Sequence, residues 1–337
     1  MPNTTLHFNA PPQGEPVPGE TLKRVVDEAF DPETVDIKGG ILVKCKALSL
    51  DPYMRGRMRD PKIKSYNEAF ELHQPLQTLA VGEVVRSDVE DIKIGETFRG
   101  MMPFSEWAVV PKEQVKFGKV LQGEFQGLPA TTLVGAAGMP GATAWVGLYD
   151  IGRPKRGETI FVSAASGAVG QVVVQLAKRE GLTVIGSAGS EEKVKHLREL
   201  GVDIAFNYKT ESTLEVLQQN PPDLYFDNVG GPTLDAVLAT IEPKGRIIAC
   251  GSVSQYNVEG EKYGLKESWQ VVTKTIRWEG FIVFQHDQTA FEREFPKMLK
   301  SGDIKVREHV TRGIDNGEAF VDMLAGRNHG KAVISLE

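Results

Sequence analysis

Hydrophobic positions follow two different patterns along the chain, and the change between them divides the sequence. Over residues 39–117, short apolar runs such as GGILVKCKALSL and LQTLAVGEVVRS alternate with polar positions and turns. This pattern is typical of β-strands in a β-rich domain. From about residue 127 to residue 295, β-like runs alternate instead with amphipathic helical segments joined by short connections. That rhythm predicts an α/β fold with a doubly wound parallel sheet.

The last part of the chain returns to the first pattern. A helix around AFEREFPKMLKSG is followed by the β-like segments VREHVTRGI and KAVISLE, which flank a short helix. We expect these segments to pair with the N-terminal strands. The sequence therefore predicts a β-rich domain over residues 1–126, completed by residues 296–337, and a nucleotide-binding domain over residues 127–295. A cleft between the two domains is expected to hold the substrate.

A glycine turn opens the predicted α/β domain. In FVSAASGAVG, residues 161–170, Gly167 and Gly170 occupy the last two glycine positions of the G-x-G-x-x-G pattern, and Ala165 replaces the first. Small residues at these positions let the backbone approach a pyrophosphate, while the following helix presents its positive N-terminal end to the anion. We expect the dinucleotide to contact this turn, whose residues are Ala165, Ser166, Gly167, Ala168 and Val169.

The end of the next predicted strand bears on which dinucleotide binds. NAD-binding versions of the fold place an acidic residue there, whereas this strand ends in SAGS, followed by Lys193 in the first turn of a helix. A cation at that edge suits the 2′-phosphate of NADPH. Glu191 and Glu192 argue the other way, although acids in a first helical turn commonly compensate the helix dipole. The sequence therefore favours NADPH.

Later strands of the same predicted sheet end in further polar residues. Asn228, Cys250 and Ser252 fall at the carboxyl ends of strands, where ligands bind in open α/β sheets. Cys250 is also the kind of small residue that packs without reacting. We expect this edge to face the cofactor.

Composition limits the other classes of function. The 337 residues carry 39 basic and 45 acidic side chains, a net charge of −6, which offers no general field for nucleic acid. The basic residues between Arg55 and Lys64 form either an anion site or a solvated loop. Two cysteines provide neither a disulfide framework nor a four-thiolate zinc site. With no basic apolar start and no run of about 18 apolar residues, we expect a cytoplasmic protein without a membrane segment.

Several long motifs together resemble one family. SLDPYMRGRM, GMPGATAWVGL, AASGAVGQVVVQLAK, GSAGSEEKV, DNVGG, CGSVSQYN, WEGFIV and GRNHGKAVI occur in the order found in zinc-independent medium-chain dehydrogenase/reductases. Within them the chain is similar to the NADPH-dependent 2-alkenal and enone double-bond reductases, which include prostaglandin, plant alkenal and curcumin reductases. The resemblance implies a GroES-like β domain joined to a Rossmann domain, and a homodimer formed through the edge strand TIRWEGFIV.

The resemblance also implies roles for individual residues. Gly189, Lys193 and Tyr208 match positions that hold the adenosine ribose phosphate, and Asn228, Cys250 and Asn328 match contacts to the nicotinamide half. Tyr53 and Tyr256 match tyrosines of the substrate cleft, and Phe281 and Val283 are expected at its floor beside the cofactor. The zinc ligands of related alcohol dehydrogenases would fall near Asp51 and Thr78, so no catalytic metal is expected.

Conjugate reduction is the chemistry that these features favour. A hydride reaches the β-carbon of an α,β-unsaturated aldehyde or ketone, and a hydroxyl stabilises the enolate oxygen. Tyr256 is the candidate donor, with help from the cofactor ribose, while Tyr53 either shapes the pocket or donates a proton. The alternatives are a quinone oxidoreductase or natural-product pathway reductase of the same fold, and a cofactor-binding protein without catalysis.

Overall fold

The computed structural model describes all of residues 1–337 and divides into two compact units. Unit 1 comprises Met1–Gly138 and Glu308–Glu337, and unit 2 comprises Met139–Arg307. The predicted fold class is confirmed, because one unit is built on mainly antiparallel sheets and the other on a parallel sheet. None of the helices combines the length and the apolar character needed to cross a bilayer.

Unit 1 is built around a seven-stranded sheet that combines strands of the first part of the chain with the two C-terminal strands. Its order is β15-β16-β3-β5-β6-β8, with β7 also paired to β3, and a second sheet has the order β2-β1-β4. The expected return of the C-terminal segment is present, since β16 pairs antiparallel with β3. The strands of unit 1 are β1 (Asn3–Phe8), β2 (Leu22–Asp27), β3 (Ile41–Ser49), β4 (Gln74–Pro75), β5 (Gln77–Ser87), β6 (Thr97–Pro103), β7 (Trp107–Val110), β8 (Lys119–Val120), β15 (Glu308–Arg312) and β16 (Lys331–Ser335).

Short helices close the edges of this unit. They are α1 (Tyr53–Arg57), α2 (Lys112–Val115), the 3₁₀ turn η1 (Gly123–Phe125), α3 (Ala130–Val134) and α11 (Glu318–Leu324). The alternation read from the sequence is visible in β3, where Val43 and Cys45 are buried while Lys44 between them is exposed.

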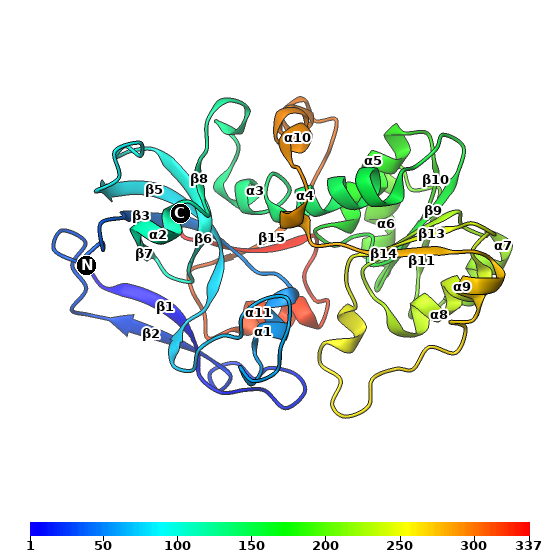
Figure 1. Ribbon diagram of the computed structural model, residues 1–337, viewed down its shortest axis with the longest axis horizontal. Helices are drawn as coiled ribbons and strands as arrows, with labels where there is room; N and C mark the ends of the chain where they lie inside the picture. The colour runs from blue at the N-terminus through cyan, green and yellow to red at the C-terminus, as the bar shows by residue number, and fades with distance from the viewer. The chain divides into compact units, whose positions relative to one another are not determined.

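Unit 2 is a doubly wound sheet of six parallel strands, in the order β11-β10-β9-β12-β13-β14. Figure 1 shows helices on both faces of this sheet, with α5 above it and α8 below. This coverage explains why β9 and β12 are apolar throughout most of their length. The strands are β9 (Thr159–Val162), β10 (Thr183–Ala188), β11 (Ile204–Asn207), β12 (Leu224–Asp227), β13 (Arg246–Ala249) and β14 (Arg277–Gly280).

The sheet order places a topological switch point between β9 and β12. Chain order from β9 outwards runs to one side through β10 and β11, then to the other through β12, β13 and β14. Ligands in such sheets bind outside the carboxyl ends of the strands at that point. The helices and turns of the unit are α4 (Met139–Val146), η2 (Gly147–Gly152), α5 (Gly170–Arg179), α6 (Glu191–Glu199), α7 (Thr213–Gln219), α8 (Gly231–Thr240), η3 (Val253–Gln255), α9 (Gln270–Thr273), η4 (Val283–Gln285) and α10 (Thr289–Ser301).

The divisions between the units fall after Gly138 and after Arg307, whereas the sequence placed them after residues 126 and 295. Residues 127–138 stay with unit 1 because α3 packs on β3, β5 and β16. The stretch after α10 stays with unit 2 because two glutamines of α5 bind its backbone. Gln175 accepts from the amide of Lys305 at 2.9 Å, and Gln171 accepts from the amide of Arg307 at 2.8 Å.

Candidate functional site

The glycine turn lies between β9 and α5, as the sequence predicted. The amide of Gly167 donates to the carbonyl of Ala164 at 2.9 Å, which closes the turn. A Cβ at Gly170 would lie 2.6 Å from the Cα of Ala165, so the last position of the pattern tolerates no side chain. Ala164 takes up a left-handed conformation with φ +47°, which is strained for a residue other than glycine. The turn therefore depends on close backbone contact.

Ala165 fits the first glycine position because the neighbouring strand makes room for its methyl group. Its amide donates to the carbonyl of Ser187 on β10 at 2.9 Å. Opposite it on that strand is Gly186, where a Cβ would lie only 3.1 Å from the Cβ of Ala165. Ala165 and Ser166 are buried behind the turn, while Gly167, Ala168 and Val169 are partly exposed. These three residues present the backbone that a pyrophosphate would meet.

The tip of β10 gathers a tyrosine and two lysines around Gly189. A Cβ at Gly189 would lie 3.0 Å from the Tyr208 hydroxyl and 3.3 Å from Cε of Lys209. Partial burial lowers the pKa of Lys193, and the nearby charge of Lys209 lowers it further. Two ammonium groups held near each other, with a half-exposed tyrosine, favour an anion such as a phosphate monoester. Lys209 was not predicted from the sequence, although it directly follows Tyr208.

The acids that argued for NAD have partners within the protein. Asn207, buried at the end of β11, donates to Glu191 at 2.9 Å and accepts from the amide of Lys209 at 3.1 Å. Glu192 lies 3.7 Å from the guanidinium of Arg307. Both carboxylates are thus accounted for by contacts of unit 2. Asn207, which the sequence did not reveal as important, joins α6 to the loop that carries Tyr208.

A buried hydrogen-bond network holds the carboxyl end of β12 against β9. The hydroxyl of Tyr225 lies 2.8 Å from Asp227 Oδ1 and 2.9 Å from Ser163 Oγ. Asp227 Oδ1 also accepts from the amides of Val229 and Gly230, at 3.0 and 2.7 Å. Burial raises the pKa of Asp227, and these donors oppose that rise. The network fixes the turn in which Asn228 lies.

Asn228 is oriented by Ser163 at the switch point. Its side-chain amide donates to the carbonyl of Ser163 at 2.8 Å, and its backbone amide donates to the Ser163 hydroxyl at 3.1 Å. With the nitrogen of the side chain held in this way, the opposite end of the amide is its oxygen, an acceptor. An acceptor at this edge suits the carboxamide or ribose of a nicotinamide nucleoside.

Tyr256 folds back on the end of β13. Its hydroxyl accepts from the amide of Ser252 at 3.4 Å, and a Cβ at Gly251 would lie 3.4 Å from the same oxygen. Ser252 in turn lies against Gly230, whose Cβ would come within 3.1 Å of the Ser252 Cβ. The segment that carries Tyr256 therefore rests on the turn that carries Asn228, and both lie at one edge of the sheet.

Cys250 sits beside this edge as a packing residue. Its backbone amide donates to the carbonyl of Asp227 at 3.0 Å. Burial, together with the nearby charge of Asp227, raises the pKa of its thiol to about 12. Because the thiolate is the reactive form, a thiol of this kind is inert near neutral pH.

Phe281 and Val283 follow the carboxyl end of β14. The ring of Phe281 packs over Gly147, whose Cβ would lie 3.0 Å from it, and Val283 is buried. Trp145 of α4 also has ring neighbours in unit 2. Its ring centroid is 4.7 Å from that of Tyr149, and Phe291 and Phe295 lie within 6.4 Å.

Tyr53 and Asn328 belong to unit 1, so the structure does not place them with the residues of unit 2. Tyr53 is the first residue of α1, and burial raises the pKa of its hydroxyl. The side-chain amide of Asn328 donates to the carbonyl of Gly330 at 2.7 Å. Around Tyr53, Arg55 donates to the carbonyl of Gly14 at 2.7 Å and Arg57 to that of Glu68 at 2.9 Å. Both arginines therefore donate to backbone carbonyls. These bonds give part of the basic cluster a role that requires no bound anion.

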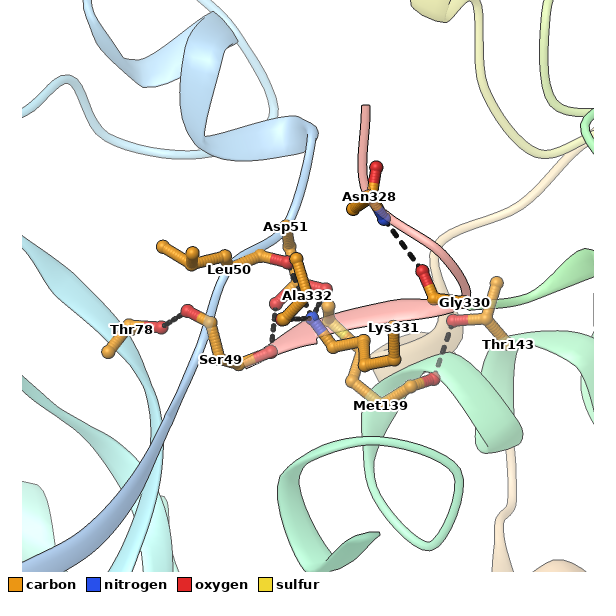
Figure 2. A network of polar contacts seen from close by, with 10 residues as sticks. All are labelled: Ser49, Leu50, Asp51, Thr78, Met139, Thr143, Asn328, Gly330, Lys331 and Ala332. Atoms are coloured by element: carbon orange, nitrogen blue, oxygen red, sulfur yellow. Dashed lines mark hydrogen bonds and ion pairs between the residues drawn. The ribbon is translucent and has the colours of Figure 1, made fainter. Parts of the chain in front are cut away.

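The positions expected near zinc ligands carry a different arrangement. Asp51 is 3.1 Å from the ammonium of Lys331, and the Thr78 hydroxyl donates to the carbonyl of Ser49 at 2.5 Å (Figure 2). Nowhere in the chain do three or more His, Cys, Asp or Glu side chains come together as metal ligands. An aspartate already paired with a buried ammonium does not fit a catalytic zinc ion.

Comparisons with known proteins agree with this architecture. Residues 6–117 match the family described as the N-terminal domain of oxidoreductase, and residues 168–301 match the one described as zinc-binding dehydrogenase. The chain is 40% identical to the NADP-dependent oxidoreductase RED1 of Cochliobolus heterostrophus, over 99% of this chain and 97% of that protein. The chain belongs to the medium-chain dehydrogenase/reductase family. One of the two matched regions lies in each unit.

Reductases of conjugated compounds are among its relatives. The NADP-dependent 2-alkenal reductase of Nicotiana tabacum is 42% identical over 87% of this chain and 86% of that protein. The NADPH-dependent curcumin reductase of Escherichia coli is 36% identical, over 96% and 94%. The crystal structure of CurA from Vibrio vulnificus in complex with NADPH superposes with a TM-score of 0.86 at 33% identity, and 99% of each chain is covered. The resemblance predicted from the motifs is thus confirmed.

Proposed function

We propose that this protein is an NADPH-dependent oxidoreductase of the alkenal and curcumin reductase type, which reduces the carbon–carbon double bond of α,β-unsaturated aldehydes or ketones. The observation that carries the proposal is the shared sheet edge of unit 2. At this edge, the glycine turn, the lysines near Gly189, Asn228 and the turn that carries Tyr256 follow the ends of neighbouring parallel strands. NADPH, when bound, supplies the hydride that the β-carbon accepts.

The cofactor would be held at three places along that edge. The backbone of Gly167, Ala168 and Val169 would meet the pyrophosphate, and Gly189, Lys193 and Tyr208 would hold the 2′-phosphate. Asn228, Cys250, Ser252, Phe281 and Val283 would surround the nicotinamide half, with Asn328 supplied by unit 1. The fit to a phosphate rests on Lys193 and Lys209, whose charges act on each other, although the carboxylate of Glu192 also acts on Lys193.

The reaction needs an electrophilic group at the carbonyl oxygen, since negative charge develops there as an enolate. The Tyr256 hydroxyl is the donor that we propose, because it lies at the carboxyl edge of the sheet, 3.4 Å from the Ser252 amide. A ribose hydroxyl of the cofactor can share this task. A proton then reaches the α-carbon from solvent or from Tyr256, and Tyr53 of unit 1 is proposed to shape the substrate pocket.

Turnover on a small panel tests the function. Oxidation of NADPH and of NADH is followed with a 2-alkenal, an aryl enone, a saturated aldehyde and a quinone. Reduction of the alkenal or enone with NADPH, and not of the saturated aldehyde, is expected. Turnover of the quinone alone would favour a quinone oxidoreductase, and NADPH binding without turnover of any compound would favour a cofactor-binding protein.

Tyr256→Phe tests the proposed donor. Loss of one such hydrogen bond to a developing oxyanion lowers kcat by about 10² to 10³. Tyr263→Phe is the matched control, because that tyrosine lies in the same part of the chain but its hydroxyl is bound to Asp235 at 2.8 Å. A loss of less than tenfold for Tyr256→Phe contradicts its role.

We also infer a homodimer formed along β14, which is one of the two edge strands of the parallel sheet. Trp278 on this strand is 41% exposed, and Val272 in α9 and Trp269 just before that helix are more exposed still. Edge strands with apolar side chains favour pairing with another strand. Analytical ultracentrifugation is expected to give twice the mass of one chain, and Trp278→Lys to weaken the association.

A further inference from the structure

Lys331 is a fully buried cation at the start of β16 in unit 1. It is 2% exposed, and its ammonium donates to the carbonyls of Leu50 and Ala332 at 2.5 and 3.0 Å and to Asp51 Oδ1 at 3.1 Å. These three bonds use all three ammonium hydrogens. Figure 2 shows the side chain of Lys331 reaching these acceptors from one strand to the end of another. The cation is completely satisfied by the protein.

The contacts continue through Asp51 into the sheet. Its Oδ2 accepts from the Ser49 hydroxyl at 2.5 Å, and the carbonyl of Ser49 accepts from Thr78 on β5 at 2.5 Å. Gly135 lies beside the lysine stem, where a Cβ would be 3.4 Å from Cγ of Lys331, an ordinary packing distance. A single hydrogen-bonded chain thus crosses β16, β3 and β5.

Two segments with proposed site residues meet at this cation. On one side, the backbone carbonyl of Asp51, whose side chain pairs with Lys331, accepts from the amide of Met54 at 3.1 Å at the start of α1, whose first residue is Tyr53. On the other, Asn328 lies three residues before Lys331 and donates to the carbonyl of Gly330 at 2.7 Å. The pair Lys331–Asp51 is the point at which these segments are joined.

A buried ion pair is not needed merely to hold two strands together. Apolar residues of similar volume commonly stabilise a core equally well, because burying two charges costs much of what their attraction provides. What an ammonium with three fixed acceptors adds is direction, since each hydrogen bond constrains the position of a particular carbonyl or carboxylate. Here the constrained groups precede Tyr53 and follow Asn328.

We propose that Lys331, together with Asp51, is a positioning residue that keeps the α1 segment carrying Tyr53 and the loop carrying Asn328 in a fixed mutual arrangement. The role rests on the proposed function, because it presumes that Asn328 contacts the cofactor and Tyr53 the substrate. Neither charged group touches a reactant. Each acts through the site residue next to it in the chain.

The test replaces the pair by apolar side chains and separates stability from positioning. Lys331→Met/Asp51→Leu removes both charges, so Tm is expected to stay within a few degrees. The Kd for NADPH, measured by fluorescence titration, is expected to rise about tenfold, because small displacements of positioned groups can cost as much as about 10²-fold. The enone KM is expected to rise as well. The control is Lys46→Met/Glu83→Leu, which removes an exposed Lys–Glu pair of the same sheet and should change neither constant.

Coupling to Asn328 distinguishes positioning from a structural role. If Lys331 acts through Asn328, Lys331→Met/Asp51→Leu should raise the Kd for NADPH less than twofold when it is introduced into the Asn328→Ala variant. In that variant the contact of Asn328 with the cofactor is already lost. An equal tenfold rise in both backgrounds overturns the proposal, as does an unchanged Kd in the paired variant. Should that variant not fold, Asp51→Asn keeps the shape of the side chain and is judged by the same coupling. The NADPH titration needs no substrate. If the unmodified protein did not reduce enones, the proposed function would fail, while the titration would still test the positioning role.

Discussion

Tyr225→Phe isolates the network that orients Asn228. The substitution removes a single hydroxyl from the buried end of β12. The ring itself is expected to remain in place, since it stacks on Phe161 with centroids 5.1 Å apart and planes 9° from parallel, a contact that phenylalanine makes equally well. The change in stability therefore reports the hydrogen bonds and not the packing.

The expected magnitude follows from what the hydroxyl contacts. Because a carboxylate only accepts hydrogen bonds, the hydroxyl of Tyr225 donates its proton to Asp227, 2.8 Å away. Its oxygen then accepts from the Ser163 hydroxyl at 2.9 Å. A hydrogen bond to a charged group contributes about 1.5–3 kcal/mol, so we expect the free energy of unfolding to fall by about 2 kcal/mol. The looser Asn228 should also weaken NADPH binding.

Urea unfolding and NADPH titration measure the two effects. Tyr149→Phe is the matched control, because its hydroxyl also binds a carboxylate, Glu180 at 2.9 Å, but at the surface. Exposed pairs of this kind contribute about 0–1 kcal/mol. The reasoning is refuted if Tyr225→Phe destabilises the protein no more than Tyr149→Phe does, or if NADPH binding is unaffected while stability falls.

Three further outcomes follow from the geometry. Ala164→Gly should raise the free energy of unfolding, measured with urea, by about 0.5–1 kcal/mol, because relief of the left-handed strain exceeds the added chain entropy. An unchanged free energy of unfolding would show that φ +47° is not strained. Lys209→Ala should raise KM for NADPH by about tenfold and leave that for NADH unchanged, whereas Lys195→Ala on the exposed side of α6 should alter neither. The thiols of Cys45 and Cys250, whose pKa burial raises to about 12, should stay protonated and resist alkylation at pH 8 in the folded protein but react in urea; rapid reaction of the native protein would contradict this.

The alternation of strands and helices in unit 2 could be predicted because each element has its own hydrophobic period and its own turn or capping residues. The turn at Gly167 and Gly170 and the helix that begins at Gly170 follow from local sequence, whereas the edge position of β14 was implied by the family resemblance. Residues at strand ends could be named as candidates for the same reason, since parallel strands bring their carboxyl ends to one edge.

Features that depend on partners distant in the chain were not predicted. Ala165 at a glycine position looks like a weakened motif, and only the pairing of β9 with β10 brings Gly186 opposite it. The Glu191 carboxylate reads as a surface charge, yet Asn207 binds it from the end of β11. Lys209 can be recognised as a candidate phosphate-binding residue only because the fold places it beside Gly189 at the end of β10. In each case the neighbour belongs to another strand or loop.

Lys331 is the strongest example of this limit. Lysine is a residue that sequence patterns assign to the surface, and in KAVISLE it precedes an apolar strand as a solvated charge commonly would. Its acceptors Leu50 and Asp51 lie about 280 positions earlier, and they reach it only because β16 pairs with β3. A buried charge must find partners or lose its proton, so such a residue constrains the fold around it more than any apolar neighbour does. The same constraint makes the place of a buried ion pair a guide to which segments must not move relative to each other.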